Sequence, residues 1–438
     1  MHLSRIAVGV AVAVGLAVGS STLRSQQAPP VNVPGIDKPV IVVTGEITGT
    51  ENWVNTNYYV LRGAVFVREG GTLNIAAGTR IVGEAGSVGT LIVLRGGRLN
   101  AIGTADAPIV FTSDQPMGRR GRGDWGGIII NGRARVNFGS GEAAGEGDTG
   151  VYGGTDDNDN SGSLHYVRVE FSGVEFSPDN ELNGIAFQAV GRRTSVHHVQ
   201  AHMSRDDALE WFGGTVDGKY IVASNAADDA IDWTFGWTGR LQYAVVTQRG
   251  DDADNGIEAD NNEFNNNVLP RSHPQIYNLT MCGDRDTNEG SESPRAANLR
   301  RGSAFTIRNF LITGFKTVGF QISDAATLAQ VDNGTSQIGA GVSWNITTPM
   351  HASVTTYINS GRFPNIRTNV EPGVSTAACS NHEAPNFQPS SIATLAGGQM
   401  APIQPANDGF FDAVTFIGAV PPAPAENWMD GWTSFPQN

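Results

Sequence analysis

Three pairs of aspartates recur at nearly constant spacing in the middle of the chain. The pairs begin at Asp206, Asp228 and Asp251, so the two steps between them are almost equal and lie in the low twenties. Each pair precedes a short apolar run that carries a further acid. If these repeats stack as strands, equivalent carboxylates lie about 4.8 Å apart. The expected columns are Asp206, Asp228 and Asp251; Asp207, Asp229 and Asp252; and Glu210, Asp232 and Glu258.

Carboxylates at this spacing repel one another unless protons, solvent or cations intervene. Two unit charges about 4.8 Å apart repel by roughly 1 kcal/mol in water, and by about 3–4 kcal/mol at an effective dielectric near 20. Hard cations such as Ca²⁺ bind to oxygen ligands of this kind. The alternative is that the pairs are solvated turn formers. We therefore predict Ca²⁺ as a cofactor, with Asp207, Asp229 and Asp252 as ligands and with Glu210, Asp232 and Glu258 on the binding face.

A second candidate for Ca²⁺ binding precedes these repeats. Asp157, Asp159 and Ser161 place oxygens at alternate positions, and Gly162 follows them. This is how a Ca²⁺-binding loop begins, with glycine allowing the sharp turn. The twelfth position is Arg168 instead of glutamate, so the EF-hand pattern does not continue. A Ca²⁺-stabilised loop and a plain turn rich in Asp and Asn both remain open.

The same acids are candidates for catalysis. Hydrolysis of a glycosidic bond uses two carboxylates roughly 5–9 Å apart, and stacked columns supply such distances by construction. The candidates are Asp206, Asp228, Asp229 and Asp251, although the chain has no intact motif of a lyase or galacturonan hydrolase. Among the aromatic residues, Trp211 and Trp233 recur at the repeat spacing and are expected inside. Trp237 breaks the alternation and is expected to be an exposed platform for sugar stacking.

The elements that position these residues are predicted from the same period. A repeat in the low twenties is typical of a solenoid, in which each turn buries its apolar face against the next. Glycine pairs that begin at Gly70 and Gly96 separate short strand-like runs at a similar, slightly longer spacing. We therefore predict an all-β fold, a single-stranded parallel β-helix over residues 27–330. Residues 138–163 are expected to form a long loop excursion, and residues 331–438 an irregular region that packs on or caps the β-helix.

Composition limits the compartment and the partners. Residues 1–26 combine a basic start with an apolar core too short to span a membrane, which predicts a secretory signal. We expect a secreted, extracellular or cell-surface protein without a transmembrane segment, and the periplasm is the alternative. The two cysteines, Cys282 and Cys379, are expected to form a disulfide in such a compartment. A net charge of −14 argues against nucleic acid as a partner.

Several short motifs carry a resemblance to a known family. They begin at Gly70 (Gly-Gly-Thr-Leu-Asn-Ile), Asp124 (Asp-Trp-Gly-Gly), Tyr152 (Tyr-Gly-Gly-Thr-Asp-Asp), Glu210 (Glu-Trp-Phe-Gly-Gly-Thr) and Trp432 (Trp-Thr-Ser-Phe). The chain resembles a family of secreted bacterial proteins, often lipoproteins, that is similar to the pectate-lyase-like superfamily. This resemblance implies a right-handed parallel β-helix, but the family has no established activity. The chain departs from the lipoprotein members because no cysteine follows its apolar N-terminal core.

These features favour a non-catalytic exported β-helix. It is expected to bind a polysaccharide or another cell-surface component, with Ca²⁺ on its acidic face. The first alternative is a polysaccharide hydrolase or lyase that uses the stacked aspartates. The second alternative is a structural surface protein that self-assembles. The sequence does not determine the oligomeric state.

Overall fold

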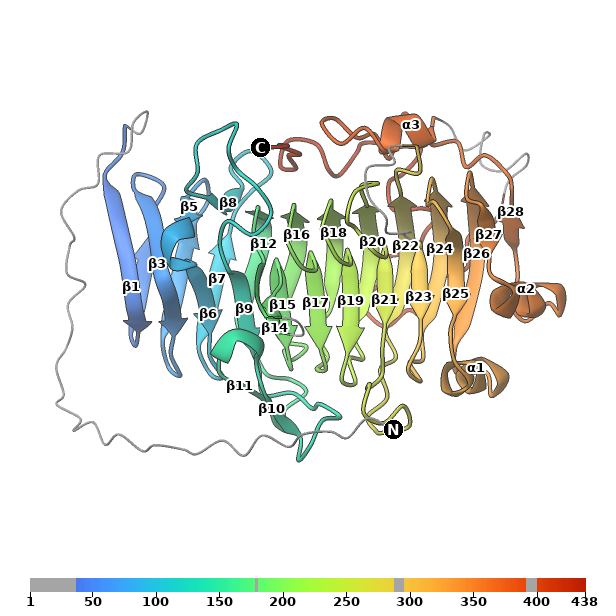
Figure 1. Cartoon of the computed structure of the whole chain (residues 1–438), viewed down its shortest axis with the longest axis horizontal. Helices are drawn as coiled ribbons and strands as arrows, with labels where there is room; N and C mark the ends of the chain where they lie inside the picture. Colours follow the sequence, from blue (N-terminus) through green and yellow to red (C-terminus); the bar gives the residue numbers. More distant parts are fainter. Residues whose placement is uncertain (1–36, 178–179, 287–294, 391–399) are drawn as a thin grey trace.

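The chain folds into a parallel β-helix whose axis runs along the longest dimension of the molecule (Figure 1). The computed structural model describes residues 37–177, 180–286, 295–390 and 400–438. The expected signal segment, residues 1–26, lies outside the described residues. Strands of successive turns pair in parallel throughout one large sheet. The structure thus confirms the all-β, parallel β-helix fold.

Short strands from successive turns form the first face of the β-helix. Each pairs in parallel with the equivalent strand one turn away. In chain order they are β6 (Thr90–Val93), β9 (Gly127–Asn131), β15 (Ile185–Gln188), β17 (Leu209–Phe212), β19 (Ile231–Thr234), β21 (Ile257–Ala259), β23 (Ala297–Leu299), β25 (Val318–Ile322) and β27 (Thr348–Met350).

Long strands form the other two faces, because a residue with positive φ bends each of them near its middle. Tyr166, Tyr220 and Asn278 are three such residues, with φ of 52°, 61° and 58°. The halves before and after the bend lie on different faces. These strands are β12 (Gly162–Glu170), β16 (Ser195–His202), β18 (Gly218–Ser224), β20 (Arg240–Thr247), β22 (Gln275–Cys282), β24 (Thr306–Thr313) and β26 (Gln337–Trp344), with β28 (Ile366–Thr368) pairing to the second half of β26.

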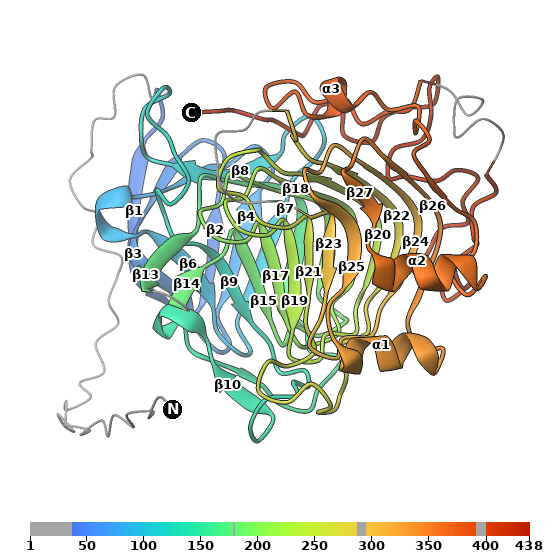
Figure 2. The ribbon, with the colours of Figure 1, turned by 45° about the vertical axis from the view of Figure 1, so that its right-hand side comes forward.

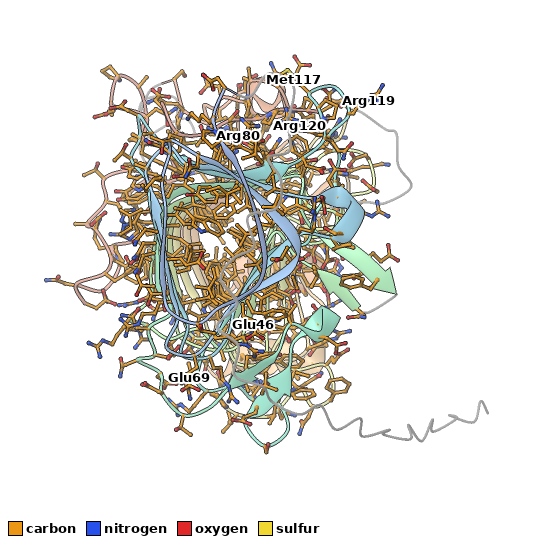
Figure 3. The ribbon with its side chains drawn as sticks, turned by 90° about the vertical axis from the view of Figure 1, so that its left-hand side faces the viewer. Glu46, Glu69, Arg80, Met117, Arg119 and Arg120 are labelled. Carbon is orange, nitrogen blue, oxygen red and sulfur yellow. A yellow bond between two sulfur atoms is a disulfide. The ribbon has the colours of Figure 1, made fainter. Side chains whose placement is uncertain are left out.

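The N-terminal turns build the same faces from both long and short strands. The long strands β1 and β3 bend at Gly45 and Gly63, both of which have positive φ. The short strands β7 and β8 pair with the two halves of β12. Viewed from this end, Arg80, Arg119 and Arg120 gather at one edge of the β-helix, and Glu46 lies toward the opposite edge (Figure 3). The strands are β1 (Val40–Ile47), β2 (Thr50–Trp53), β3 (Tyr58–Val67), β4 (Thr72–Ala76), β5 (Arg80–Gly83), β7 (Arg98–Ile102) and β8 (Ile109–Ser113).

Alternating residues of each strand fill the interior, as the period of two in a strand requires. In β17, Leu209 and Trp211 are buried in the core, whereas Glu210 points to the outside of the β-helix. Trp211 stacks on Phe187 of the preceding turn, with ring centroids 5.4 Å apart. The expected interior position of Trp211 is confirmed, and the apolar ladder fixes the direction of its acidic neighbours.

Two antiparallel hairpins leave the solenoid and cover part of the first face. Tyr152, from the first excursion, packs against Phe212 on the outside of β17, and Leu182, from the second, belongs to the same apolar cluster. The expected excursion after residue 138 is therefore present. The hairpins are β10 (Glu142–Ala144) with β11 (Val151–Gly153), and β13 (Val174–Ser177) with β14 (Asn180–Leu182); two short 3₁₀ helices are η1 (Ala85–Ser87) and η2 (Glu146–Asp148).

The β-helix continues beyond residue 330, where the sequence period fades. Helix α1 (Ala325–Asp332) interrupts the strand pattern, but β26, β27 and β28 then complete further turns. The boundary expected at residue 330 therefore falls inside the β-helix. Helices α1 and α2 (Ala352–Asn359) lie at its C-terminal end (Figure 2).

The last part of the chain runs back along the side of the β-helix instead of covering its end (Figure 1). Gln200 donates from Nε2 to the Ser434 carbonyl over 2.7 Å, and Arg120 contacts the carbonyl of Asn438. The expected disulfide between Cys282 and Cys379, at the end of α3 (Thr376–Cys379), is present. It ties this returning segment to β22.

Candidate cation-binding site

Strand register brings the acids of the first face together. Glu210 in β17, Asp232 in β19 and Glu258 in β21 occupy equivalent positions on three successive turns. Their neighbours in the strands point inward, so these three side chains lie on the outer surface of the sheet. The expected third column is therefore present.

The aspartates before each strand join one turn to the next. The Asp229 amide donates to Asp207 Oδ1 over 2.9 Å, and the Asn255 amide donates to Asp229 Oδ1 over 2.6 Å. Each aspartate thus binds the backbone of the following turn, which is the turn-forming role expected of such residues. The second carboxylate oxygen is the one that remains for other ligands.

The third aspartate pair does not extend these columns. Ile231 pairs with Ile257, and this step along the chain is longer by three positions than the step from Asp228 to Asp251. The inserted positions shift the alignment, so Asp254 stands where Asp251 was expected. The prediction that Asp251 and Asp252 complete the columns is wrong for this reason.

Asp251 and Asp252 instead take part in ion pairs with arginines. Arg122 Nη1 lies 3.0 Å from Asp251 and also contacts Asp252. Arg205 Nη1 lies 3.1 Å from Asp252, and Arg249 lies 3.3 Å from Asp251. These two aspartates therefore neutralise arginines that come from several turns and from the loop before β9.

Carboxylates of the correctly aligned residues form four overlapping groups. In each group, one oxygen from each of three side chains lies within 4.8 Å of the others. We name the eight residues the acidic ladder. The groups are Asp206, Asp207 and Asp228; Asp207, Glu210 and Asp232; Asp228, Asp229 and Asp254; and Asp229, Asp232 and Glu258.

The middle of the acidic ladder is shielded from solvent, whereas Asp228 is exposed. Asp207, Asp229 and Glu210 expose only 5%, 4% and 8% of their surface. Burial, and then the neighbouring acids, raise the pKa of each of these three carboxyls well above its usual value. Burial also raises the pKa of Glu258 to about 7, although the nearby Arg300 opposes the shift. The ladder thus holds protons near neutrality or binds a cation that replaces them.

Basic side chains reach the acidic ladder at one end. Arg300 contacts Glu258 and lies 2.9 Å from Asp260, and Arg295 lies 3.9 Å from Asp254. Within the described ranges, no lysine or arginine nitrogen lies within 4.0 Å of Asp207, Glu210, Asp229 or Asp232. These four carboxyls therefore form no ion pair with a described residue, although the charge of Arg300 opposes the rise in the pKa of Asp232.

The donor set fits a hard divalent cation. All the grouped ligand atoms are carboxylate oxygens, the donors that Ca²⁺ prefers. Asp232 Oδ1 is a buried oxygen without a hydrogen-bond partner among the described residues. An orphaned buried acceptor costs about 1–3 kcal/mol, and a cation bound to it would remove this cost. Asp207, Glu210, Asp229 and Asp232 could hold such an ion.

A small cleft opens beside one end of the acidic ladder. Its volume is about 180 Å³, and Asp206 and Asp228 from the ladder line it together with Glu175, Glu181 and Arg205. Burial and then Asp228 raise the pKa of Asp206 well above its usual value. The cleft therefore gives solvent and small ligands access to two of the ladder carboxyls.

The second Ca²⁺ candidate is occupied by protein partners. Asp157 forms an ion pair with Arg135, whose Nε donates to Asp157 Oδ2 over 2.9 Å. Asp159 Oδ2 accepts from the Arg133 amide over 3.2 Å and from Ser161 Oγ over 3.3 Å. Arg135 therefore already supplies the positive charge that a cation would bring to Asp157.

Trp237 is not the exposed platform that its position in the sequence suggested. Its side chain is fully buried, its ring stacks on Trp211 at 4.6 Å, and its Nε1 donates to the Val216 carbonyl. The prediction of an exposed ring is wrong because the chain turns inward after Gly236, which has a φ of 90°. Trp237 fills the core instead.

Three residues of the site escaped the analysis of the sequence. Asn183 donates from Nδ2 to Glu210 Oε2 over 2.6 Å and accepts from the Asp207 amide. Asp254 completes one carboxylate group, and Asn255 donates to two ladder acids. Aligning the turns on their apolar strands, instead of on the aspartate pairs, would have found the last two. Nothing in the sequence near Asn183 marks it.

The fold and the site define a parallel β-helix with a partly buried carboxylate ladder on the outer surface of its first face. Residues 45–433 match the family described as the pectate-lyase-like beta helix domain, and the chain belongs to this family. Comparisons with the curated proteins and with the solved structures gave no match. In the part of the chain that the structure describes, no helix has the length and apolar character needed to cross a membrane.

Proposed function

We propose that this protein is an exported, non-catalytic β-helix that binds a glycan or another cell-surface component through divalent cations on its acidic ladder. The single observation that carries the proposal is the set of four overlapping carboxylate groups, each with oxygens within 4.8 Å. Ca²⁺ is the proposed ion because the donors are hard oxygens. The family supports a role connected with polysaccharides.

Export is part of this proposal. A disulfide persists in oxidising compartments and is rare in the cytosol, and Cys282 and Cys379 form one here. The apolar N-terminal segment predicts a secretory signal on independent grounds. Free Ca²⁺ is also available outside the cell, so the location and the ion support each other.

A bound cation also explains how so acidic a protein could hold a ligand. The chain carries a net charge of −14, which repels acidic glycans. Ca²⁺ accepts six to eight oxygens, about half of which the ladder could supply. The remaining positions are open to hydroxyl or carboxylate oxygens of a sugar. The ion then bridges two partners that would otherwise repel each other.

Calorimetric titration with CaCl₂, after treatment with EDTA, tests the cation. We expect binding by the wild-type protein and a loss of at least about tenfold in affinity in Asp232→Asn, because one buried charged ligand is removed. The matched control is Glu84→Gln, which alters an acid already paired with Arg62 at 2.8 Å. Wild-type protein that takes up no Ca²⁺, or equal affinities in both variants, would refute the cation site.

A hydrolase is the second candidate, and the cleft beside Asp206 favours it. A carboxyl with a raised pKa can donate a proton, and Asp228 lies next to it within the same group. Its test is the release of reducing ends from a polysaccharide panel incubated with wild-type protein and with Asp228→Asn. Release by the wild type that is lost in the variant would replace the binding role with a catalytic one.

A further inference from the structure

A row of aromatic rings leads away from the acidic ladder along the outside of the β-helix. Phe212 lies two residues after Glu210 in β17, so both side chains leave the same face about 7 Å apart. Phe212 and Phe235 have ring centroids 6.3 Å apart, and Phe235 and Phe138 are 4.9 Å apart. Phe138 then meets Phe264 at 5.7 Å. The row thus connects the ladder to the loop after β21.

The row ends in an open pocket of about 350 Å³. We name it the phenyl pocket; its main lining residues are Phe138, Phe264, Val268, Asn137, Asn262 and Asn265. It carries no charged lining residue, although the protein around it is strongly acidic. Phe264 exposes 72% of its surface, far more than a large aromatic side chain in a folded protein usually does. The pocket therefore offers a neutral, apolar floor with amides beside it.

Hydrogen bonds hold this loop in place. Asn262 Oδ1 accepts from the amides of Phe264 and Asn265, over 2.9 Å and 3.0 Å. Asn261 donates from Nδ2 to the carbonyls of Asn266 and Val268, and Asn137 donates to Asn261 Oδ1 over 2.8 Å. The loop and the excursion that carries Phe138 extend from the same edge of the β-helix (Figure 1). A ring exposed on a fixed backbone binds a ligand without a large ordering cost.

The chemistry of the pocket indicates the kind of ligand. A pyranose ring has one apolar face of C–H groups and a rim of hydroxyls, so it pairs with an aromatic ring and with neighbouring amides. The side-chain nitrogen of Asn265 makes no hydrogen bond within the described residues, and it is exposed at the pocket. We propose that the phenyl pocket binds the apolar face of a neutral pyranose unit of the glycan engaged by the acidic ladder. This inference rests on the proposed glycan binding.

The test compares two equally exposed apolar residues of the same loop. Phe264 lines the pocket and Leu269 does not, and each exposes 72% of its surface. Cellohexaose, chitohexaose and hexagalacturonate are titrated in CaCl₂ into wild-type protein, Phe264→Ala, Phe264→Trp and Leu269→Ala. We expect Phe264→Ala to weaken binding of a hexamer about three- to tenfold. Phe264→Trp should keep the affinity, and Leu269→Ala should change it less than about twofold.

The outcomes separate this inference from the proposed function. Equal glycan affinity in Phe264→Ala and Leu269→Ala would overturn the phenyl pocket while leaving glycan binding intact. A wild-type protein that binds Ca²⁺ but none of the hexamers would overturn the glycan proposal and the pocket together, and would retain the cation site. Light scattering is measured on each variant. If the wild type self-associates and Phe264→Ala alone abolishes this without changing sugar affinity, the pocket is an interface between copies.

Discussion

The acidic ladder makes the stability of the protein depend on pH in a predictable direction. Burial raises the pKa of Glu258 from 4.5 to about 7. Between these values the folded chain retains a proton that the unfolded chain releases, so the free energy of unfolding falls as pH rises. This one group contributes a loss of about 3 kcal/mol, because each pKa unit corresponds to about 1.4 kcal/mol. Asp207, Asp229 and Asp232 shift in the same direction and add to the loss.

Ca²⁺ should reverse most of this loss, because the ion binds the ionised carboxylates. At a concentration about 100 times its dissociation constant, a ligand adds about 2.7 kcal/mol of stability. The assay is urea unfolding, followed by tryptophan fluorescence, at pH values from about 5 to 8 in EDTA and in CaCl₂. We expect stability to fall with pH in EDTA and to change much less in CaCl₂.

One variant and one control test whether the pH dependence of stability comes from the acidic ladder. Glu258→Gln removes the titrating group, so between pH 5 and 8 its stability in EDTA should fall by about 2.5 kcal/mol less than that of the wild type. The control is Glu84→Gln. Arg62 lowers the pKa of Glu84, which therefore titrates below this window, and the pH dependence should stay unchanged. Wild-type stability that stays level or rises from pH 5 to 8 in EDTA, or an unaltered slope in Glu258→Gln, would refute the reasoning.

Two further predictions concern the fold. The disulfide closes a loop of 97 residues, so replacing both Cys282 and Cys379 by serine should destabilise the protein by up to about 4–5 kcal/mol. The measurement is the thermal midpoint with and without a reductant, which should lower the midpoint of the wild type and leave that of the serine variant unchanged. Trp237→Ala should cost about 3–5 kcal/mol, since it opens a cavity in the core. Its Ca²⁺ affinity, measured below its unfolding temperature, should match the wild type, whereas weakened binding in a fully folded variant would place the ring at the ligand surface after all.

Much of the fold was predictable because its main signal is local and repeated. Apolar residues alternate within each strand, and glycines or paired acids mark the turns, so the period alone indicates stacked parallel strands. The same rule placed Glu210, Asp232 and Glu258 in one column, and the register confirms it. The disulfide followed from having two cysteines in a chain that is expected to be exported. Features that recur in successive turns are therefore visible in the sequence.

The remaining features depend on contacts between distant parts of the chain. A short insertion was enough to move Asp251 and Asp252 out of the columns, and Arg122, 129 residues before Asp251, neutralises them both. No local sequence pattern predicts an ion pair between residues so far apart in the chain. The return of the C-terminal segment along the β-helix, with Gln200 bound to Ser434, is hidden for the same reason.

The distribution of arginines then distinguishes the acidic ladder from ordinary surface acid. Elsewhere on the β-helix several acids meet an arginine of a neighbouring turn, as Glu46 meets Arg68 and Glu84 meets Arg62. The displaced Asp252 follows this rule, although it belongs to the same sequence repeat as the ladder. Asp229 does not follow it, and it is more deeply buried than any of these acids. Burial without a paired arginine destabilises a carboxylate, so the ladder makes physical sense as a place where protons or an external cation supply the missing positive charge.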